Sequence, residues 1–534
     1  MEIARGPGAA GAQGIRLTDS FTWQYDLGVV KTSTINAHPV DGSGPTASLA
    51  YDVLGRVVTA TDVDGSQVHT RYEWCHDQGG YGACRLPNAT FLVAADVDYL
   101  PQGGGERRAA GASRTILDAF GRQIGAFSDR SGAPGELPGQ YREFDDRGFI
   151  KRASTAPIAY ADTAYFDDFV ALPTYDVLGR VVSRTAPTQE DDEATSSTVY
   201  RGLQTEQSDN RGAVWRYTSD VLGRMVRVDN PDPLTGAFGA GATATTYTYT
   251  QFDELRSVTD PEQQETHATY NGLGWRETLT DPNSGTWQFQ HNAFGELVQQ
   301  VSPRQAIEGT ATRWTYDRLG RMTQRTEAEG NTYWRYYDTA DAPWRGMLHE
   351  VEYPVKLLAG GTRTERYAYD SLTRLSEWRD LGSDTAVGVA YDGVGRVEQI
   401  IYPEVAQGHF AVSYAYDERS RVSAATTHDG RTLYRANTFD RFGRATDIDL
   451  GNGVKVSAET DRAVGAVKTL VDAAANLAAI QHFSYEWDAN GNTIARRDLK
   501  HEVTDSFAYD YMNSLTSHTV AQSQGGYTDD YTIG

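Results

Sequence analysis

The sequence predicts an all-β fold, a repeat array of β-hairpins that forms one long coiled sheet. Three observations support this expectation. A pattern of Asp, two variable residues, Gly and Arg recurs seven times in 534 residues, aromatic residues alternate ahead of it, and a β-prone run follows it. A short unit that recurs this often is typical of repeat architectures. The seven copies begin at Asp52, Asp118, Asp176, Asp220, Asp317, Asp392 and Asp440.

Each copy of the pattern predicts a tight turn. Asp favours the first corner of a type I turn, because its carboxylate accepts a hydrogen bond from the backbone two residues further on. Gly favours the fourth corner, where a positive φ costs it little. Together they are typical of a hairpin loop closed by a G1 bulge. We therefore expect structural roles for Tyr51, Asp52, Gly55, Arg56, Tyr175, Asp176, Gly179, Arg180, Tyr316, Asp317, Gly320, Arg321, Tyr391, Asp392, Gly395, Arg396, Phe439, Asp440, Gly443 and Arg444.

The residues on either side of the turns predict strands. Aromatic residues two positions apart precede many turns, as at Tyr247 and Tyr249 or at Tyr485 and Trp487. Residues with this spacing share one face of a strand. The run after the turn is rich in β-branched residues, as in 180–185 (RVVSRT). The unit is therefore strand, tight turn, strand.

Degenerate copies extend the array, and some of them lack the usual turn residues. Asn replaces Asp at Asn271 and Asn292, which keeps a side-chain acceptor. Where Gly is lost we expect a different loop geometry, although Asn tolerates the left-handed conformation. The copies without Gly lie at Arg256, Thr373, Ser420 and Asn513, and further degenerate copies lie at Phe144-Asp145, Phe252-Asp253, Trp487-Asp488, Tyr509-Asp510 and 460–465.

The domain organisation predicted from this pattern is one continuous body. Residues 1–20 form a flexible N-terminal segment and 21–534 form the hairpin array. Segment 60–115 has the weakest repeat signal and is a candidate small insertion, while 186–198 and 230–243 are expected to be projecting loops. Helix signals are sparse. For 463–480 the sequence allows two interpretations, a helix of about two turns within 471–480 or another degenerate hairpin.

The composition excludes some partner classes. The chain has 72 acidic and 49 basic residues, a formal net charge of −23, which opposes binding to nucleic acid and to anionic membranes. No apolar run approaches the roughly 18–20 residues needed to span a bilayer. The N-terminus also lacks the features of a signal peptide. The chain is then either part of a longer protein or exported without a cleaved signal.

The two cysteines, Cys75 and Cys84, form a candidate disulfide. They flank a Gly-rich segment, and a bridge there would suit an oxidising compartment. A metal site that adds His76 or Asp77 lacks a fourth ligand at a recognised spacing. Free thiols are the remaining alternative.

The search for chemistry finds no catalytic constellation. There is no zinc-binding His pair, no phosphate loop and no nucleophile elbow. Two Asp-rich segments, 62–65 and 488–491, resemble the start of a calcium loop but lack the remaining ligands, so a turn explains them better. Regular recurrence of Asp and Arg indicates turn closure. We therefore expect no enzyme activity, catalytic residue, metal or cofactor in this chain. An active site assembled from distant loops is a weaker alternative that names no residue.

The repeated hexapeptide resembles the YD repeat of Rhs proteins, a family that includes toxin-complex B and C subunits and teneurins. It occurs as YDVLGR at 51–56 and 175–180, YDRLGR at 316–321 and YDGVGR at 391–396, and the resemblance covers about 21–534. It implies a β-sheet strip coiled into a hollow shell. In bacterial members this shell encloses a toxic domain. The Asp-Pro pairs that begin at Asp232, Asp260 and Asp281 lie mid-array without the self-cleavage context of the family, so autoproteolysis and a toxin are not carried over.

Two functions follow from this resemblance. The first is a non-enzymatic, secreted or cell-surface bacterial scaffold that encloses a toxic or effector polypeptide for delivery. Its partners would be that cargo or the remainder of a longer polypeptide. An acidic concave face would suit a cationic, partly unfolded cargo. The second is an extracellular adhesion or glycan-binding module, suggested by Trp334, Trp344 and Trp378.

Overall fold

The computed structural model describes most of the chain. The described residues are 20–24, 29–34, 46–62, 65–75, 86, 88–99, 108–129, 138–154, 158–159, 170–189, 192–239, 241–338, 344–355, 361–393, 395–403, 410–417, 419–474, 479–522 and 525–530. Nearly all of the predicted flexible segment 1–20 therefore lies outside the described residues, as does Cys84. Structural statements below concern the described residues.

The N-terminal third is built entirely of strands in its described part. These are β1 (Ser20–Gln24), β2 (Val29–Thr34), β3 (Thr46–Tyr51), β4 (Val57–Thr61), β5 (Gln67–Trp74), β6 (Phe91–Tyr99), β7 (Arg108–Leu117), β8 (Gln123–Asp129), β9 (Pro138–Phe144), β10 (Ile150–Ser154) and β11 (Ile158–Ala159). Segment 60–115 supplies strands β5, β6 and part of β7, which pair in sequence within the sheet. Its residues 76–85 and 100–107 lie outside the described part.

The central and C-terminal parts continue in the same way, with one short helix between two strands. The central strands are β12 (Val170–Tyr175), β13 (Val181–Gln189), β14 (Asp192–Arg201), β15 (Gln204–Ser208), β16 (Val214–Ser219), β17 (Met225–Asp229), β18 (Ala244–Tyr249), β19 (Leu255–Thr259), β20 (Glu265–Tyr270), β21 (Arg276–Asp281), β22 (Gly285–His291) and β23 (Leu297–Val301). The remaining elements are α1 (Pro303–Glu308), β24 (Thr312–Tyr316), β25 (Met322–Glu327), β26 (Gly330–Tyr336), β27 (Leu348–Pro354), β28 (Thr362–Tyr369), β29 (Leu375–Asp380), β30 (Thr385–Tyr391), β31 (Val397–Ile401), β32 (Ala411–Tyr416), β33 (Val422–Thr427), β34 (Thr432–Phe439), β35 (Ala445–Leu450), β36 (Val454–Thr460), β37 (Val467–Ala474), β38 (Ala479–Trp487), β39 (Thr493–Asp498), β40 (Val503–Tyr509), β41 (Leu515–Gln522) and β42 (Tyr527–Asp530).

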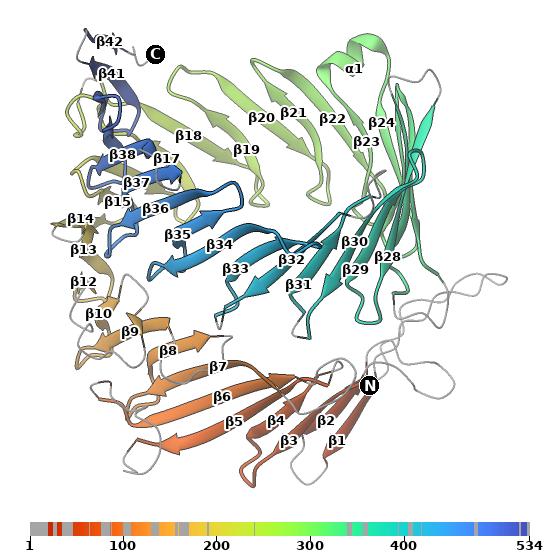
Figure 1. Cartoon of the computed structure of the whole chain (residues 1–534). Coiled ribbons are helices and arrows are strands. Elements are labelled where there is room, and N and C mark those ends of the chain that lie inside the picture. The colour runs from red at the N-terminus through yellow and green to blue at the C-terminus, as the bar shows by residue number, and fades with distance from the viewer. Residues whose placement is uncertain are drawn as a thin grey trace.

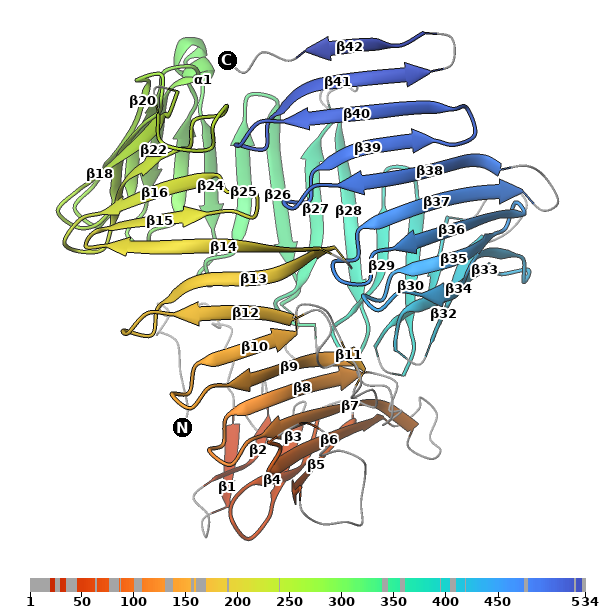
Figure 2. The ribbon, with the colours of Figure 1, turned by 90° about the vertical axis from the view of Figure 1, so that its left-hand side faces the viewer.

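All 42 described strands belong to one sheet, and every pairing between them is antiparallel. Each strand pairs with its neighbours in sequence, except that β10 pairs with β12 and the two-residue β11 pairs with β9. The ribbon winds around on itself, so that its C-terminal strands come to lie beside strands β13 to β17 from the central part of the chain (Figures 1 and 2). The predicted all-β array of hairpins in one coiled sheet is confirmed.

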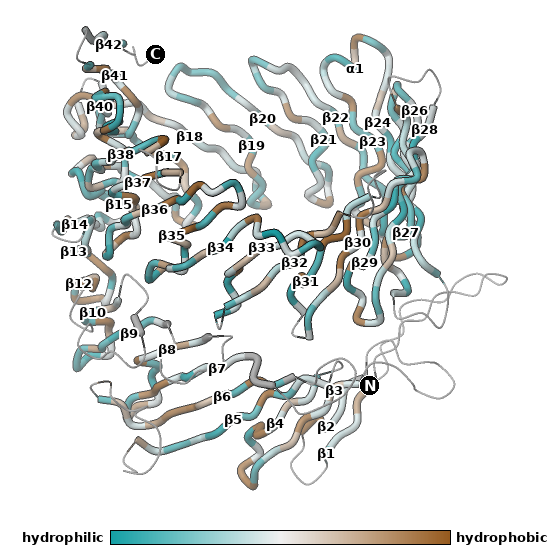
Figure 3. The backbone as a smooth tube through the Cα atoms, viewed as in Figure 1, coloured by the Kyte–Doolittle hydropathy of each residue, from teal (hydrophilic) through white to brown (hydrophobic). Residues whose placement is uncertain are grey.

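The sheet is a single layer with two different faces. In the β24–β25 hairpin, Tyr316 and Trp314 lie on one face, whereas Thr315 lies on the other and its hydroxyl is 2.9 Å from that of Thr323. The same hydroxyl pairing recurs at Thr269 and Thr278, 2.7 Å apart. Figure 3 shows hydrophilic and hydrophobic residues mixed along most strands, as this alternation requires.

The accessible surface is that of an open wall. The chain exposes 31305 Å². A compact monomer of 58.7 kDa would expose about 19,000 Å². Because the described part of the chain has no second layer of secondary structure over the sheet, most side chains on both faces are half-buried, and stability depends on contacts between neighbouring strands.

A small hydrophobic core forms at one place only in the described part of the chain. It is built on β6 to β9 and contains Leu86, Leu92, Ala94, Ala112, Ile116, Ile124, Phe127 and Tyr141, with Cys75 packed against it. Leu86 precedes β6 and lies over Gly125, where an added Cβ would come within 2.6 Å of the leucine side chain. Leu86 and Cys75 thus cover part of the sheet where the repeat signal is weakest.

The structure decides two expectations about regular structure. It selects one of the two alternatives for 463–480, and it shows that the expectation of a loop at 186–198 was wrong. In the described part of 463–480, strands β37 and β38 are paired and antiparallel, with Thr469 opposite Ser484, which favours the hairpin alternative; residues 475–478 lie outside the described residues. The segment 186–198, expected to be a loop, instead forms the ends of the paired strands β13 and β14, with Ala186 opposite Ala194. Its small and polar residues suit a wall that needs no continuous hydrophobic core.

The helix α1 was not predicted. Ser302 caps it, with its Oγ accepting from the Gln305 backbone N–H at 3.2 Å, while the Gln305 side chain accepts from the Ser302 N–H at 2.9 Å. Pro303 begins the helix and Gly309 ends it at φ 68°. The sequence 302–305 carries the signal for this capping box. The helix is too short to produce a periodic pattern.

The loss of Gly does not change the turn geometry, contrary to expectation. Thr373 has φ 64° and Ser420 has φ 57°, and both close the same hydrogen bonds as the glycine copies. In each of these turns two backbone N–H groups donate to the carboxylate of the leading Asp and hold the turn, so a non-Gly residue tolerates the left-handed conformation. At 249–254 the assignment shifts by three residues. Thr250, not Asp253, occupies the first corner.

Candidate functional site

The repeated corner is the feature that the sequence singles out, and the structure gives its geometry. In the copy at 317–321, the backbone N–H of Asp317 donates to the Arg321 carbonyl at 2.9 Å, and that of Gly320 donates to the Asp317 carbonyl at 3.1 Å. Asp317 Oδ1 accepts from the backbone N–H groups of Leu319 and Arg321 at 2.8 and 3.0 Å. Its Oδ2 accepts from Arg321 Nε at 2.7 Å. One carboxylate thus satisfies two turn amides and a guanidinium.

Each corner also joins the next hairpin. The Arg321 guanidinium lies 4.2 Å from the centre of the Tyr336 ring, and the Tyr336 hydroxyl donates to the Met322 carbonyl at 2.9 Å. Arginine over an aromatic face and a hydroxyl on a backbone oxygen both stabilise the contact. The same arginine stacking recurs for Arg56 with Tyr72, Arg122 with Phe144, Arg180 with Tyr200, Arg374 with Tyr391, Arg396 with Tyr416 and Arg421 with Phe439.

The predicted structural residues all lie at such corners. The hydroxyls of Tyr51, Tyr175, Tyr316 and Tyr391 donate to carbonyls of the preceding hairpin, those of Val30, Ile150, Leu297 and Leu375. The side chains of Arg56, Arg180, Arg321, Arg396 and Arg444 donate to Asp52, Asp176, Asp317, Asp392 and Asp440. Gly55, Gly179, Gly320, Gly395 and Gly443 have φ between 75° and 85°. The link from one corner to the next was not predicted, although Tyr precedes the motif in four of its seven copies.

The electrostatics of the corners favours a structural role. The backbone N–H of Arg180 is the largest influence that holds the pKa of Asp176 below its ordinary value, with further help from the Arg180 side chain. At Asp317, burial alone would raise the pKa, but hydrogen bonds from Arg321 and Leu319 outweigh it and lower the pKa. Carboxylates held in the charged form by their own turn are poor proton donors or acceptors near neutral pH.

The candidate disulfide is half within the described residues. Cys75 is disulfide-bonded. It lies at the end of β5, and its backbone N–H donates to the Thr90 carbonyl at 3.0 Å. Because Cys84 lies outside the described residues, its pairing with Cys75 stays a prediction.

A second candidate site is the seam where the ribbon meets itself. Here the turns after β38 and β40 lie against the turn between β15 and β16 (Figure 2). Arg211 donates to the carbonyls of Tyr509 and Asp510 at 3.1 and 3.0 Å and lies 3.4 Å from Asp488 Oδ2. Asn490 Nδ2 donates to Asp209 Oδ2 at 2.7 Å. Residues almost 300 positions apart are thereby joined.

The seam extends on both sides of Arg211. Gln189 Nε2 donates to the Trp487 carbonyl at 2.8 Å, and the Tyr511 N–H donates to the Pro233 carbonyl at 3.0 Å. Gly236 lies directly against the Tyr511 ring, where a Cβ would come within 2.6 Å. The loop 230–243, correctly expected to be a loop, therefore supports the next coil. Two different edges of the sheet meet at this seam. One is the edge that carries the repeated turns, here 488–491 and 510–513, and we call it the turn edge. The other is the opposite edge, here the turn at 209–213 and the loop 230–243, and we call it the connection edge.

A polar cluster lies on the aromatic face across β27, β28 and β29. Glu365 accepts from the hydroxyls of Tyr353 and Tyr367 at 2.8 Å each and from Trp378 Nε1 at 3.1 Å. Burial, together with the hydrogen bond to Glu365, raises the pKa of Tyr367 to about 12. The side chain of Arg363 holds the pKa of the fully buried Asp380 well below its usual range. Every charge in this cluster has a hydrogen-bonded partner.

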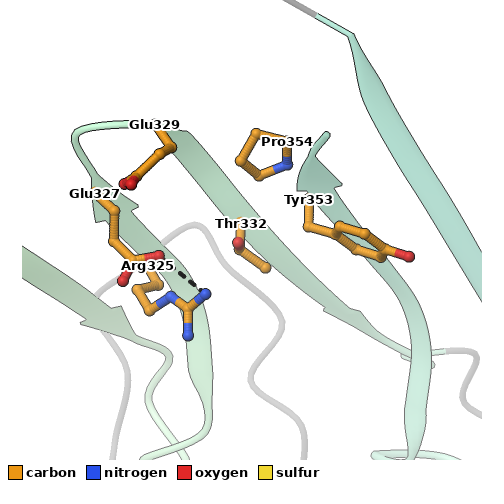
Figure 4. Close-up of a pocket in the computed structure, with 6 residues that line it drawn as sticks. All are labelled: Arg325, Glu327, Glu329, Thr332, Tyr353 and Pro354. Atoms are coloured by element: carbon orange, nitrogen blue, oxygen red, sulfur yellow. Dashed lines mark ion pairs between the residues drawn. The ribbon is translucent and has the colours of Figure 1, made fainter. Parts of the chain in front are cut away.

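A pocket of about 430 Å³ adjoins this cluster. Figure 4 shows its lining side chains between β25, β26 and β27, with an ion pair of 3.0 Å between Arg325 and Glu327. The lining residues are Arg325, Glu327, Glu329, Thr332, Tyr353 and Pro354. No nucleophile is paired with a base among them. Within the described ranges, no three His, Cys, Asp or Glu side chains are grouped so that they could hold a metal ion.

Comparisons with known proteins agree with this geometry. The sequence profile of the RHS Repeat family matches residues 304–332. No match was found among curated protein sequences. Nor does any helix in the described part of the chain have the length and apolarity to cross a membrane.

Solved structures show the same fold. A crystal structure of TcdB2-TccC3 without the hypervariable C-terminal region aligns with a TM-score of 0.69 at 13% identity, over 97% of this chain and 34% of that chain. The crystal structure of TcdB2-TccC3-TEV aligns at 0.67 and 13%, over 94% and 32%. The Photorhabdus luminescens Tc holotoxin pore with a TccC3 variant aligns at 0.66 and 12%, over 94% and 32%. The chain thus spans about a third of each of these structures.

The expected resemblance is therefore confirmed at the level of repeat and fold. The chain contains an RHS repeat and has the coiled, single-layer β-fold of the Rhs-repeat shell in the Tc toxin proteins.

Proposed function

We propose that this chain is a wall segment of an encapsulating shell, which encloses a toxic or effector polypeptide for secretion and delivery. The single observation that carries this proposal is the seam. The ribbon coils and then fastens to itself through Arg211 and Asn490, and a sheet fastened in this way acts as a wall. The proteins with the same fold are components of a Tc toxin.

The chemistry of the wall supports a scaffold. The acidic side chains of the corners and of the Glu365 cluster accept hydrogen bonds within the wall, so these carboxylates have a structural role. The remaining acidic excess, with a net charge of −23, would attract a cationic, partly unfolded polypeptide by diffuse electrostatics. A single-layer wall with mixed faces also offers few continuous apolar patches on which such a cargo could aggregate. Secretion to the cell exterior belongs to this proposal.

The three tryptophans that suggested a glycan-binding function do not support it in the structure. Trp334, Trp344 and Trp378 are all half-buried in the wall, and Trp378 donates its ring N–H to Glu365. A sugar-binding platform needs an exposed aromatic face. Glycans therefore remain a prediction of the sequence analysis.

A protease-protection experiment tests the proposal. The complete polypeptide encoded by the reading frame that contains this chain is expressed and digested, with and without seam substitutions at Arg211 and Asn490. We expect a segment outside the wall repeats to survive digestion in the wild type and to be cleaved rapidly when the seam is open. Electron cryo-microscopy should show density inside the wall. A wall with an empty interior and no protected segment would rule out encapsulation.

A further inference from the structure

The turn edge of the sheet has a row of exposed apolar side chains in the first coil of the ribbon, between β3 and β23; the strands from β24 onwards form the second coil. We call this set the turn rim; its members are Val53, Leu54, Phe120, Val177, Leu178, Val221, Leu222, Phe252, Leu273 and Phe294, which are 69–98% exposed. All occupy the tips of hairpin turns between β3 and β23. One such residue alone would need no explanation, but a row of ten along one edge marks an interaction surface.

The chain itself shows what such an edge binds. In the second coil the corresponding turn tips are Asn490 and Met512, and neither is fully exposed. The turns that carry them lie against the connection edge of the first coil, at Asn210, Arg211 and Pro233. A turn edge of this ribbon is therefore complementary to a connection edge of the same ribbon.

In the described part of the chain, the connection edge of the second coil also carries exposed apolar side chains. Its exposed apolar residues, which we call the connection rim, are Ile307 in α1, Leu381, Tyr402, Phe410 and Leu499. They lie on the connections between β23 and β40, along a stretch of ribbon similar in length to that of the turn rim. The seam joins residues 279–302 positions apart. Repeating the same winding beyond β42 would bring the turn rim of a following ribbon onto this connection rim.

We propose that the turn rim binds the connection rim of a second copy of this chain, stacked head to tail. Every surface that the contact needs is present on this one chain. The contact continues the seam already seen between its two coils. Because the two surfaces differ, the association is heterologous and leaves one rim free at each end, so further copies can add.

Light scattering coupled to size exclusion tests this inference. The wild-type chain should have a mass that rises with concentration across the micromolar range, from 58.7 kDa towards multiples of it. A turn-rim variant with Leu178→Asp and Leu222→Asp should stay monomeric, as should a connection-rim variant with Ile307→Asp and Phe410→Asp. Leu172→Asp is the matched control, since Leu172 is an exposed leucine in strand β12, outside both rims and the seam, and its replacement should leave association unchanged.

A mixing experiment separates this geometry from any other association. Each rim variant retains one intact rim, so mixing the two should give a complex of two chains that grows no further. Circular dichroism of each variant checks that the fold is retained. A wild-type chain that stays at 58.7 kDa at all concentrations would overturn the inference, and so would rim variants that associate like the wild type or a mixture that stays monomeric.

Discussion

Replacing Arg211 with Ala should open the seam without unfolding the rest of the wall. The guanidinium donates to two backbone carbonyls, those of Tyr509 and Asp510, and its side chain is only 21% exposed. Hydrogen bonds to charged groups contribute about 1.5–3 kcal/mol each when buried, and water replaces part of this at a half-open site. We therefore expect a loss of roughly 2–4 kcal/mol, concentrated at the contact between the two coils.

Hydrogen exchange followed by mass spectrometry is the suitable assay, because a repeat array opens locally and has no single unfolding transition. Exchange of slow amides in 487–513 should accelerate by roughly 30-fold or more, since 1.4 kcal/mol corresponds to a factor of ten. Exchange in β20–β23 should not change. Arg227→Ala is the control, because Arg227 pairs only within its own coil, with Asp229. Unchanged exchange in 487–513 would refute the claim that the seam holds the coils together.

Three further predictions concern the repeated corners. Gly179→Ala should destabilise its hairpin by more than Gly223→Ala destabilises its own, although both glycines have φ near 80°, because only at Gly179 does an added Cβ come 2.4 Å from the Phe149 ring. Gly223→Ala should cost about 1–2 kcal/mol of hairpin stability, and hydrogen exchange of the two hairpins measures the difference. Tyr336→Phe removes one hydrogen bond but keeps the ring, so it should cost about 1 kcal/mol, and a cost no greater than that of an exposed Tyr-to-Phe change would contradict this. The lowered pKa of Asp317 stabilises its hairpin above the unfolded pKa of about 4, and this contribution is lost as the pH falls through the folded pKa. Hydrogen exchange of the β24–β25 hairpin, compared between the wild type and Asp317→Asn at each pH, should therefore show a difference that disappears below about pH 4, whereas a difference that persists at low pH would argue against it.

The local unit could be predicted from the sequence because it is encoded locally. Asp, Gly and Arg within five residues determine the turn, and alternation of aromatic residues determines which face of the strand is apolar. The structure places Asp317, Gly320 and Arg321 in one closed turn, as this reasoning requires. Thr373 and Ser420 show the limit of the rule, since local hydrogen bonds hold the turn even without Gly.

The contacts between units could not be predicted in the same way. Whether Arg211 meets Asp510 depends on the pitch of the whole coil, which is the sum of small twists over many strands. The polar cluster around Glu365 was missed for a similar reason, because its partners come from three strands and share no motif. Asn490 was assigned to a turn, but its role at the seam arises only when the second coil is in place.

Electron cryo-microscopy of the isolated chain tests the central claim most directly. The account predicts one layer of antiparallel strands wound into a wall, with the turn at 209–212 in contact with the turns at 488–491 and 510–513. A map with two stacked sheets, or with these turns far apart and the ribbon uncoiled, would contradict it.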